Sequence, residues 1–196
     1  MASNVCIDGA LLSALLLAPA LSGTARGRRA LRVAGASHVL LGGFVPHGLP
    51  QPPAQLLVGA IKVAIGRPRP PTGAALYSGA ALGQGYAFPS GHTTCAVFTV
   101  GTLLFVLAPA AEEAWRERGD ARLAELATAA HGAALPLTAG AGALTAASRV
   151  AANVHWLTDV TAGGCLGTAI VILEMALLER AAQEEAELIQ NERQEG

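Results

Sequence analysis

The stretch SRVAANVHWLTDVTAGGCLGTAIVILEMALL, residues 148–178, decides how this chain folds. From Leu157 to Leu178 it is an apolar run close to the ~20 residues that a helix needs to cross a bilayer. A short polar segment that includes His155 and Asp159 lies at the start of this run. The pattern predicts a membrane helix with chemically useful side chains at one end.

The rest of the chain repeats this apolar character. Of its 196 residues 52% are hydrophobic and 14% are charged, and the mean hydropathy is +0.44. We therefore expect an all-α integral membrane bundle of about six transmembrane helices. They form one domain over residues 1–180, followed by a polar acidic tail at residues 181–196. The predicted runs cover Val5–Gly23, Ala30–Leu49, Ala54–Gly66, Thr93–Ala111, Leu123–Ala147 and Leu157–Leu178.

Two of these runs are less clear than the others. The third is short and holds Lys62, so whether it spans the bilayer stays open. The first has no positive side chain before Arg26, so we interpret it as a membrane helix rather than a cleaved signal.

Charge and cysteine content exclude several classes of protein. The formal net charge is −1, which offers no basic surface to nucleic acid. Cys6, Cys95 and Cys165 lie in apolar segments without metal-ligand spacing. We expect them to pack in the core, and we expect no metal site and no cofactor.

His155 and Asp159 are four residues apart, so on a helix their side chains share one face. A carboxylate that bonds one ring nitrogen fixes the tautomer and leaves the other nitrogen free to attack. His155 is therefore the candidate nucleophile. Arg149 lies six residues earlier and points elsewhere on a continuous helix, so a break near Asn153 is needed to bring both side chains to one site.

A second histidine follows a loop. Pro89-Ser90-Gly91-His92 ends the Gly- and Pro-rich stretch from Gly66 to Pro89 and opens an apolar helix. This placement predicts Ser90 as the N-cap and leaves the Gly91 amide open to an anion at the helix N-terminus. His92 then stands in the first turn, where an imidazole can give or take a proton.

Cations precede this loop. Lys62 is the only lysine in the chain, and Arg69 follows it across a proline-rich corner. Ammonium and guanidinium groups in a water-poor site stabilise the charge of a phosphoryl group in transfer. We expect Arg67, by contrast, to serve the surface or the lipid headgroups. Taken alone, each of these strings also fits polar residues at a membrane interface.

Together the strings resemble a known signature. Lys62-x6-Arg69-Pro70, Pro89-Ser90-Gly91-His92 and Ser148-Arg149-x5-His155-x3-Asp159 match, in order and spacing, the three-part motif of the type 2 phosphatidic-acid phosphatase superfamily, which also includes vanadium haloperoxidases. The match covers Lys62 to Asp159, about half of the chain. Every signature position is filled by the expected residue type.

The resemblance implies a role for each residue. His155 forms a phosphohistidine, Asp159 supports it, and His92 protonates the leaving alkoxide. The phosphoryl oxygens are bound without a metal by Lys62, Arg69, Ser90, the Gly91 amide and Arg149. The expected substrate is a lipid phosphate such as phosphatidic acid, phosphatidylglycerophosphate, a polyprenyl diphosphate or a sphingoid phosphate, because a membrane site suits a phosphate at headgroup depth.

Three other functions stay open. A phosphotransferase shares the phosphohistidine step, and a vanadate-dependent haloperoxidase uses the same anion site, although such relatives are larger and soluble. A non-catalytic scaffold could instead bind anionic lipid through the arginines. The oligomeric state cannot be read from the sequence.

Six spanning helices predict a topology. Both chain ends lie on one side, and the site lies on the other with the first, third and fifth loops. By this count the face of the site carries Arg26, Arg28, Arg29 and Arg32, and the remaining surface arginines lie on the opposite face. Because the numbers of arginines on the two faces are nearly equal, the positive-inside rule gives no orientation. The resemblance implies a site on the non-cytosolic face.

Several smaller expectations complete the prediction. Gly163, Gly164 and Gly167 should let two helices approach closely. Residues 112–120 form a solvated connector of mixed charge. His38, His47 and His131 should be packing or interface residues.

Overall fold

The computed structural model describes residues 17–41, 56–78 and 85–195. Within these ranges the chain is helical and has no strand, which agrees with the predicted all-α class. The elements are α2 (Ala25–Leu41), α3 (Leu56–Ile65), α4 (Pro71–Leu76), α5 (Gly91–Gly101), the π-helix η1 (Thr102–Leu107), α6 (Ala108–Glu117), α7 (Ala121–Gly132), α8 (Ala134–Ala151) and α9 (Leu157–Glu195).

Among the described residues, two helices are long and apolar enough to cross a membrane. One is the continuous helix Gly91–Glu117 formed by α5, η1 and α6, and the other is Leu157–Gln194 in α9. By contrast, α3 has 10 residues, about 15 Å of helix, which is half of a bilayer core. The predicted count of six spanning helices therefore stays a prediction, and most of the first apolar run lies outside the described residues.

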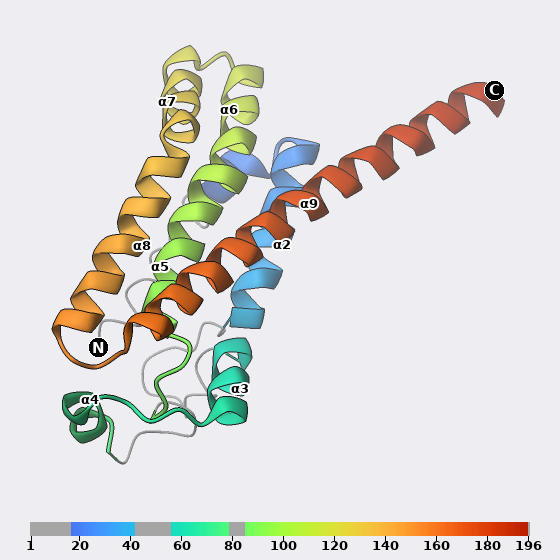
Figure 1. Cartoon of the computed structure of the whole chain (residues 1–196). Helices are drawn as coiled ribbons and strands as arrows, with labels where there is room; N and C mark the ends of the chain where they lie inside the picture. The colour runs from blue at the N-terminus through green and yellow to red at the C-terminus, as the bar shows by residue number, and fades with distance from the viewer. Residues whose placement is uncertain (1–16, 42–55, 79–84, 196) are drawn as a thin grey trace.

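Helix α5 lies at the centre, against α8 and α9 (Figure 1). Glycines on α9 make this packing close: a Cβ at Gly163 would lie 2.5 Å from the Ser90 carbonyl oxygen, and one at Gly167 would lie 2.7 Å from that of Thr94. At these two positions the predicted close approach of helices is confirmed. Any larger side chain would push the start of α5 away from α9.

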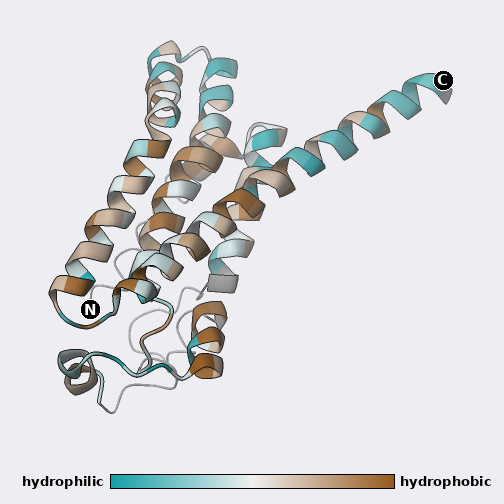
Figure 2. Ribbon diagram, viewed as in Figure 1, coloured by the Kyte–Doolittle hydropathy of each residue, from teal (hydrophilic) through white to brown (hydrophobic). Residues whose placement is uncertain are grey.

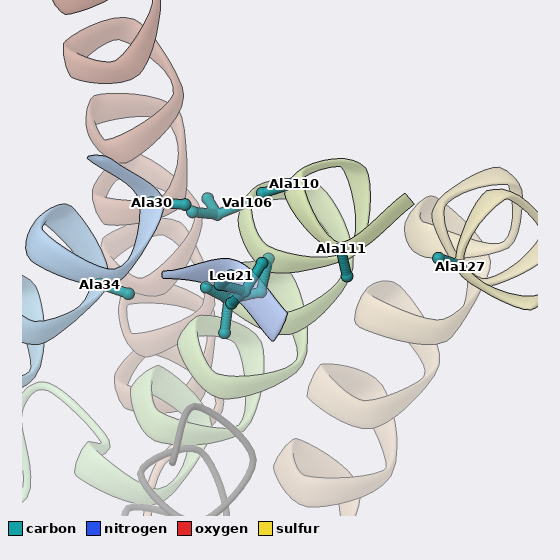
Figure 3. Close-up of a cluster of buried hydrophobic side chains, with 8 residues drawn as sticks. Leu21, Ala30, Ala34, Val106, Ala110, Ala111 and Ala127 are labelled. Carbon is teal, nitrogen blue, oxygen red and sulfur yellow. The ribbon is translucent and has the colours of Figure 1, made fainter. Parts of the chain in front are cut away.

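A second packed region joins α2 to η1, α6 and α7. Small side chains, among them Ala30, Ala34 and Ala110, lie around the fully buried Leu21, and Ala127 of α7 lies beyond Ala111 on the far side of the cluster (Figure 3). Alanines leave room for the helices to lie close together. This cluster packs the helices together at the end of the bundle that is remote from His155.

One polar group interrupts the apolar interior. Glu174 of α9 is fully buried, and its Oε2 accepts a hydrogen bond of 2.6 Å from the hydroxyl of Thr102, the first residue of η1. In the same π-helix, the Leu104 carbonyl lies 3.0 Å from the ring of His131 on α7. The last apolar run is thus not the plain apolar helix that its composition predicts.

The arginines of α2 lie at the end of the bundle remote from His155. Arg26 pairs with Glu113 of α6 at 3.7 Å, Arg29 pairs with Glu185 of α9, and Arg118 donates to the Pro19 carbonyl at 2.6 Å. The prediction that Arg26 and Arg29 share the face of the site is wrong. The prediction assumed that each apolar run crosses the membrane once, which placed this arginine-rich segment at the same end as the site. In the structure α2 begins beside the end of α6, which is the opposite end of the bundle.

The connectors differ in detail from the prediction. The mixed-charge segment is helical as far as Glu117, and Asp120 caps α7 by accepting a bond of 3.1 Å from the Leu123 amide. The predicted run Leu123–Ala147 is divided at Ala133 into α7 and α8. The acidic tail continues α9 without a break and extends beyond the bundle, where Figure 2 shows it largely hydrophilic.

Candidate active site

The predicted site residues come from five parts of the chain that meet at one end of the bundle. They are Lys62 on α3, Arg69 before α4, Ser90 and His92 at the start of α5, Arg149 in the last turn of α8, and His155 and Asp159 around the start of α9. The charges of Arg69, Lys62 and His92 all act on the His155 ring, which shows that these groups lie near one another. The strings that are separate in sequence thus form one cluster.

Ser90 is the N-cap of α5, as predicted. Its hydroxyl oxygen accepts bonds from the Thr93 amide at 3.5 Å and from the Thr93 hydroxyl at 3.2 Å. Its own amide donates to the Asp159 carbonyl at 2.9 Å, which ties the start of α5 to the start of α9. The Ser90 hydroxyl is therefore engaged in capping, and half-buried His92 stands in the turn that follows.

His155 is buried, and both of its ring nitrogens have partners. Nδ1 lies 3.4 Å from Asp159 Oδ2, and Nε2 lies 3.0 Å from a guanidinium nitrogen of Arg69. A guanidinium can only donate, so Nε2 is the acceptor and Nδ1 carries the proton that is shared with the carboxylate. This tautomer directs the Nε2 lone pair toward the cations, which agrees with the predicted His–Asp pairing.

The break between α8 and α9 turns Arg149 and His155 toward one end of the bundle. Asn153 has a φ of 52°, in the left-handed region that asparagine tolerates better than most residues. Its carbonyl accepts from the Gly73 amide at 3.2 Å, and its side chain donates to Thr72 at 3.2 Å. The predicted helix break is confirmed, and contacts with α4 hold it in place.

Arg149 ends α8 and is half-buried. Its Nε donates to the neighbouring Ser148 hydroxyl at 3.2 Å, which leaves its terminal guanidinium nitrogens for other partners. Its charge also acts on His92, across the site from Arg69. Arg149 therefore provides a second guanidinium near the start of α5.

Arg69 is the buried cation nearest to the candidate nucleophile. One of its nitrogens, NH1, donates to the Val154 carbonyl at 3.0 Å as well as to His155, and the guanidinium lies 4.0 Å from the centre of the Tyr77 ring. Burial lowers the pKa of Arg69 from its ordinary value. Tyr77 thus supports the guanidinium face, a role that sequence reasoning missed.

Lys62 is buried and holds the loop before α5. Its Nζ donates to the carbonyls of Tyr86 at 2.6 Å and Ala87 at 3.4 Å. An ammonium has three N–H donors, so two are used by the described backbone. Lys62 therefore holds the backbone segment that precedes Pro89-Ser90, in addition to bringing positive charge to the site.

Arg67 corrects one prediction. Its guanidinium forms an ion pair of 3.0 Å with Asp159 Oδ1, bonds the Thr158 hydroxyl, and lies 5.9 Å from the centre of the Trp156 ring. The expectation that Arg67 serves only the surface or the headgroups is wrong. The fixed bend of the proline-rich corner turns this side chain, which is 35% exposed, back onto α9.

Asp159 is held more firmly than a His–Asp pair alone requires. It is fully buried, and besides His155 and Arg67 it accepts a bond of 2.8 Å from the Trp156 amide. The Trp156 indole donates to the Pro68 carbonyl at 3.0 Å, which connects the corner to the same turn. No sequence pattern pointed to this role of Trp156, because its partner lies 88 residues away.

The charge of the surroundings sets the state of the candidate nucleophile. Burial, together with the positive charges of Arg69 and Lys62, lowers the pKa of His155 from 6.5 to about 3. The ring is therefore neutral at physiological pH. A neutral imidazole with an oriented lone pair among cations can attack an electrophile that carries negative charge.

The other predicted residues fall outside this cluster. His38 is buried and packs on Phe98 with 5.5 Å between ring centres, and exposed His131 contacts Leu104, so the two are a packing and an interface residue, as expected. Cys95 is buried but Cys165 is exposed, which corrects the expectation that it packs in the core: it lies on the outer face of α9. His47 and Cys6 lie outside the described residues.

Metal ligands do not cluster in the part of the chain that the structure describes. No group there brings together three or more His, Cys, Asp or Glu side chains that could hold a metal ion. The groups that converge near His155 are instead cations, a helix N-terminus and one carboxylate.

Comparison with known proteins places this site in a family. The sequence profile described as the PAP2 superfamily matches residues 53–182, about two thirds of the chain and all of the site residues discussed above. No curated protein and no solved structure matches the chain significantly. Members of this superfamily are generally phosphatases, and the apolar helices fit a membrane protein. Because the profile covers more than half of its length, the chain belongs to the PAP2 superfamily.

Proposed function

We propose that the protein is a membrane phosphatase that removes phosphate from a lipid through a phosphohistidine on His155, without a metal. The observation that carries this proposal is the pair of contacts on the buried His155 ring, Asp159 at Nδ1 and Arg69 at Nε2. One partner orients the ring, and the other is a cation suited to a phosphoryl oxygen.

In the first step, Nε2 of His155 attacks phosphorus, a P–N bond forms, and the bond from phosphorus to the lipid oxygen breaks. Before the attack, the Arg69 N–H that donates a hydrogen bond to Nε2 must donate it to a phosphoryl oxygen instead. This change of acceptor exposes the Nε2 lone pair. Asp159 stabilises the positive charge that develops on the ring. Arg67 holds the other oxygen of this carboxylate and so keeps it aligned.

His92 supplies the proton that the leaving alkoxide needs. A water then attacks the phosphohistidine, His92 accepts a proton from it, and phosphate is released. Lys62 and Arg149 stabilise the charge on the phosphoryl oxygens, together with the amides at the start of α5. Every group in this sequence of steps comes from the chain itself.

The site faces the non-cytosolic side in this proposal. Arg26, Arg29 and Arg118 lie at the opposite end of the bundle from His155. Cytoplasmic ends of membrane proteins carry an excess of lysine and arginine. The corrected position of the α2 arginines therefore supports the orientation that the sequence alone left undecided.

The test uses purified protein in detergent with phosphatidic acid, phosphatidylglycerophosphate, a polyprenyl diphosphate and a sphingoid phosphate. We expect the wild type to release phosphate from at least one, and His155→Ala and His92→Ala to be inactive. His131→Ala is the matched control, because exposed His131 lies on α7, away from the site, and contacts Leu104 and Phe105 of η1. Equal release by wild type and His155→Ala would overturn the proposal.

Two additions separate the related chemistries. Vanadate should inhibit and a chelator should not, and wild type given labelled substrate should form an acid-labile phosphoenzyme that His155→Ala lacks. Transfer of label to an added alcohol in preference to water would indicate a phosphotransferase. Halide oxidation that appears only with vanadate would indicate a haloperoxidase.

A further inference from the structure

A cavity of about 520 Å³ lies along the bundle between α5, α8 and α9, and one end of it is next to the candidate active site. Thr93 and Leu157, sequence neighbours of His92 and Trp156, line one end, and Phe105 and Met175 line the other. We call it the α8–α9 channel. Its volume falls within the range of sites that bind small ligands, about 300–1,000 Å³.

The channel runs with the helices for most of a bilayer. Its α9 wall extends from Leu157 to Met175, which at 1.5 Å per residue is about 27 Å of helix, close to the ~30 Å hydrocarbon thickness. Figure 1 shows that α8 and α9 are close where one follows the other and diverge from there on either side of α5, and Figure 2 shows apolar residues on both. The channel therefore begins at Thr93 and Leu157, next to the site residues, and extends along the apolar part of the helices.

The walls leave little for a polar ligand to bind. They are formed by apolar residues and four threonines, and three of these hydroxyls already have partners in the protein: Thr93 bonds Ser90, Thr161 bonds the Leu157 carbonyl, and Thr168 bonds the Gly164 carbonyl. Within the described residues the buried Thr138 hydroxyl is the one channel threonine without a hydrogen-bond partner.

We propose that the α8–α9 channel holds the hydrocarbon chain of the substrate while its phosphate lies beside His155. The substrate is then a phosphate ester or diphosphate of a long, linear apolar chain that enters the channel at Thr93 and Leu157. This inference rests on the proposed function and adds where the chain lies. The position of Thr93 and Leu157 next to site residues, the apolar walls and the bilayer-scale length together select this occupant.

Two glycines provide a matched test. A Cβ added at Gly164 meets only the Thr93 side chain, at 4.0 Å, so leucine at this position projects into the channel near the site without a backbone clash. Gly140 on α8 has no neighbour within 4 Å of an added Cβ and does not line the channel. Gly164→Leu is the obstructed variant, and Gly140→Leu is its control.

The substrates are ethyl, octyl, dodecyl and hexadecyl phosphate. In the wild type we expect kcat/KM to rise with chain length, by up to about fourfold per buried methylene group. Gly164→Leu should lower kcat/KM for hexadecyl phosphate at least about tenfold and leave ethyl phosphate unchanged. Thr168→Phe, one turn deeper, should spare octyl phosphate and reduce hexadecyl phosphate.

The depth dependence is the distinctive result. If Gly164→Leu and Thr168→Phe change all four substrates by one common factor, or if their profiles equal that of Gly140→Leu, the channel does not hold the chain. A merely destabilised variant would lower every rate together and would not change the chain-length profile.

A binding measurement separates this inference from the proposed function. A hexadecyl phosphate with a diazirine near the chain end should label the channel walls, and the matching diazirine alcohol should not. Channel labelling without any phosphate release would overturn the hydrolase and leave the channel assignment standing. Equal labelling by the alcohol, or labelling elsewhere, would overturn the channel and indicate ordinary bilayer lipid.

Discussion

Arginine side chains have different surroundings at the two ends of the bundle. At the site end, Arg69 is only 8% exposed and contacts His155, while at the remote end the side chains of Arg26 and Glu113 are 51% and 39% exposed. Exposed ion pairs contribute about 0–1 kcal/mol, whereas charges in a water-poor site interact strongly. The comparison teaches that burial and partners, rather than residue type, separate functional from surface arginines.

Replacing His155 should have the largest effect. His155→Ala removes the atom that bonds phosphorus and is expected to lower kcat at least about 10³-fold. Phosphate release and trapping of the phosphoenzyme measure the loss, and circular dichroism checks that the helices remain. Activity within about tenfold of the wild type would mean that another residue is the nucleophile.

Arg69→Lys keeps the positive charge but loses the planar guanidinium that joins Val154, His155 and Tyr77. We expect kcat/KM to fall about 10²-fold, as for the loss of one donor to a developing negative charge. Arg28→Lys is the control, because Arg28 is exposed and bonds only backbone carbonyls near Ser22. Similar kcat/KM values for Arg69→Lys and Arg28→Lys would contradict the prediction that arginines at the site end matter more for catalysis than arginines at the remote end.

Arg67→Gln should have an intermediate effect. Arg67 acts through Asp159 as a positioning residue, so we expect kcat to fall about tenfold while KM changes little. Arg67→Lys should restore part of the rate because it restores the ion pair. A rise in KM with unchanged kcat would instead show that Arg67 binds the substrate directly.

The pKa of His155 predicts a small response to acid. Because the pKa of the folded state is about 3, below the unfolded value of 6.5, the ring stays neutral and folding loses stability from this group only as the pH falls from 6.5 toward 3. From about pH 7.5 to about pH 5, protonation of His155 should lower kcat/KM less than twofold, against about 30-fold for an ordinary imidazole.

Nitrogen NMR of the His155 ring measures this titration directly, with His155→Ala to assign the signal. A midpoint near 6.5 would contradict the prediction. In Arg69→Gln the midpoint should rise, because the nearest positive charge that disfavours the imidazolium is removed.

The smallest effect is expected at the remote end. Arg26→Ala breaks an exposed pair and should change the free energy of unfolding by about 0.5 kcal/mol or less, with phosphate release unchanged. Thermal unfolding in detergent is the measurement. A loss of activity comparable to that of Arg67→Gln would show that the two ends are coupled.

Features that depend on neighbours in sequence could be predicted. The His155–Asp159 pair follows from a spacing of four residues, and the Ser90 cap follows from the order Pro-Ser-Gly-His before an apolar run. The glycines of α9 also predicted the close approach to α5. Each of these depends on helix periodicity or on local hydrogen bonding, which a short segment specifies by itself.

Contacts between distant segments could not be predicted in the same way. Arg69 meets His155 across 86 residues and Arg67 meets Asp159 across 92. Both arginines lie in one Arg-Pro-Arg-Pro string, in which the resemblance to the three-part motif singled out Arg69 but nothing pointed to the contact of Arg67 with Asp159. Glu174 also escaped notice, because one acidic residue hardly changes the mean hydropathy of a long apolar run.

The sequence by itself determined an all-helical apolar chain, the His–Asp pair, the capped start of α5 and the cations available near them, because composition and helix periodicity act over short distances. Three features came from the tertiary structure alone: Arg67 holds Asp159, the α2 arginines lie far from the site, and an apolar channel lies between α5, α8 and α9. These features depend on how helices that are distant in sequence pack, and that packing is fixed by side-chain shape across the whole bundle.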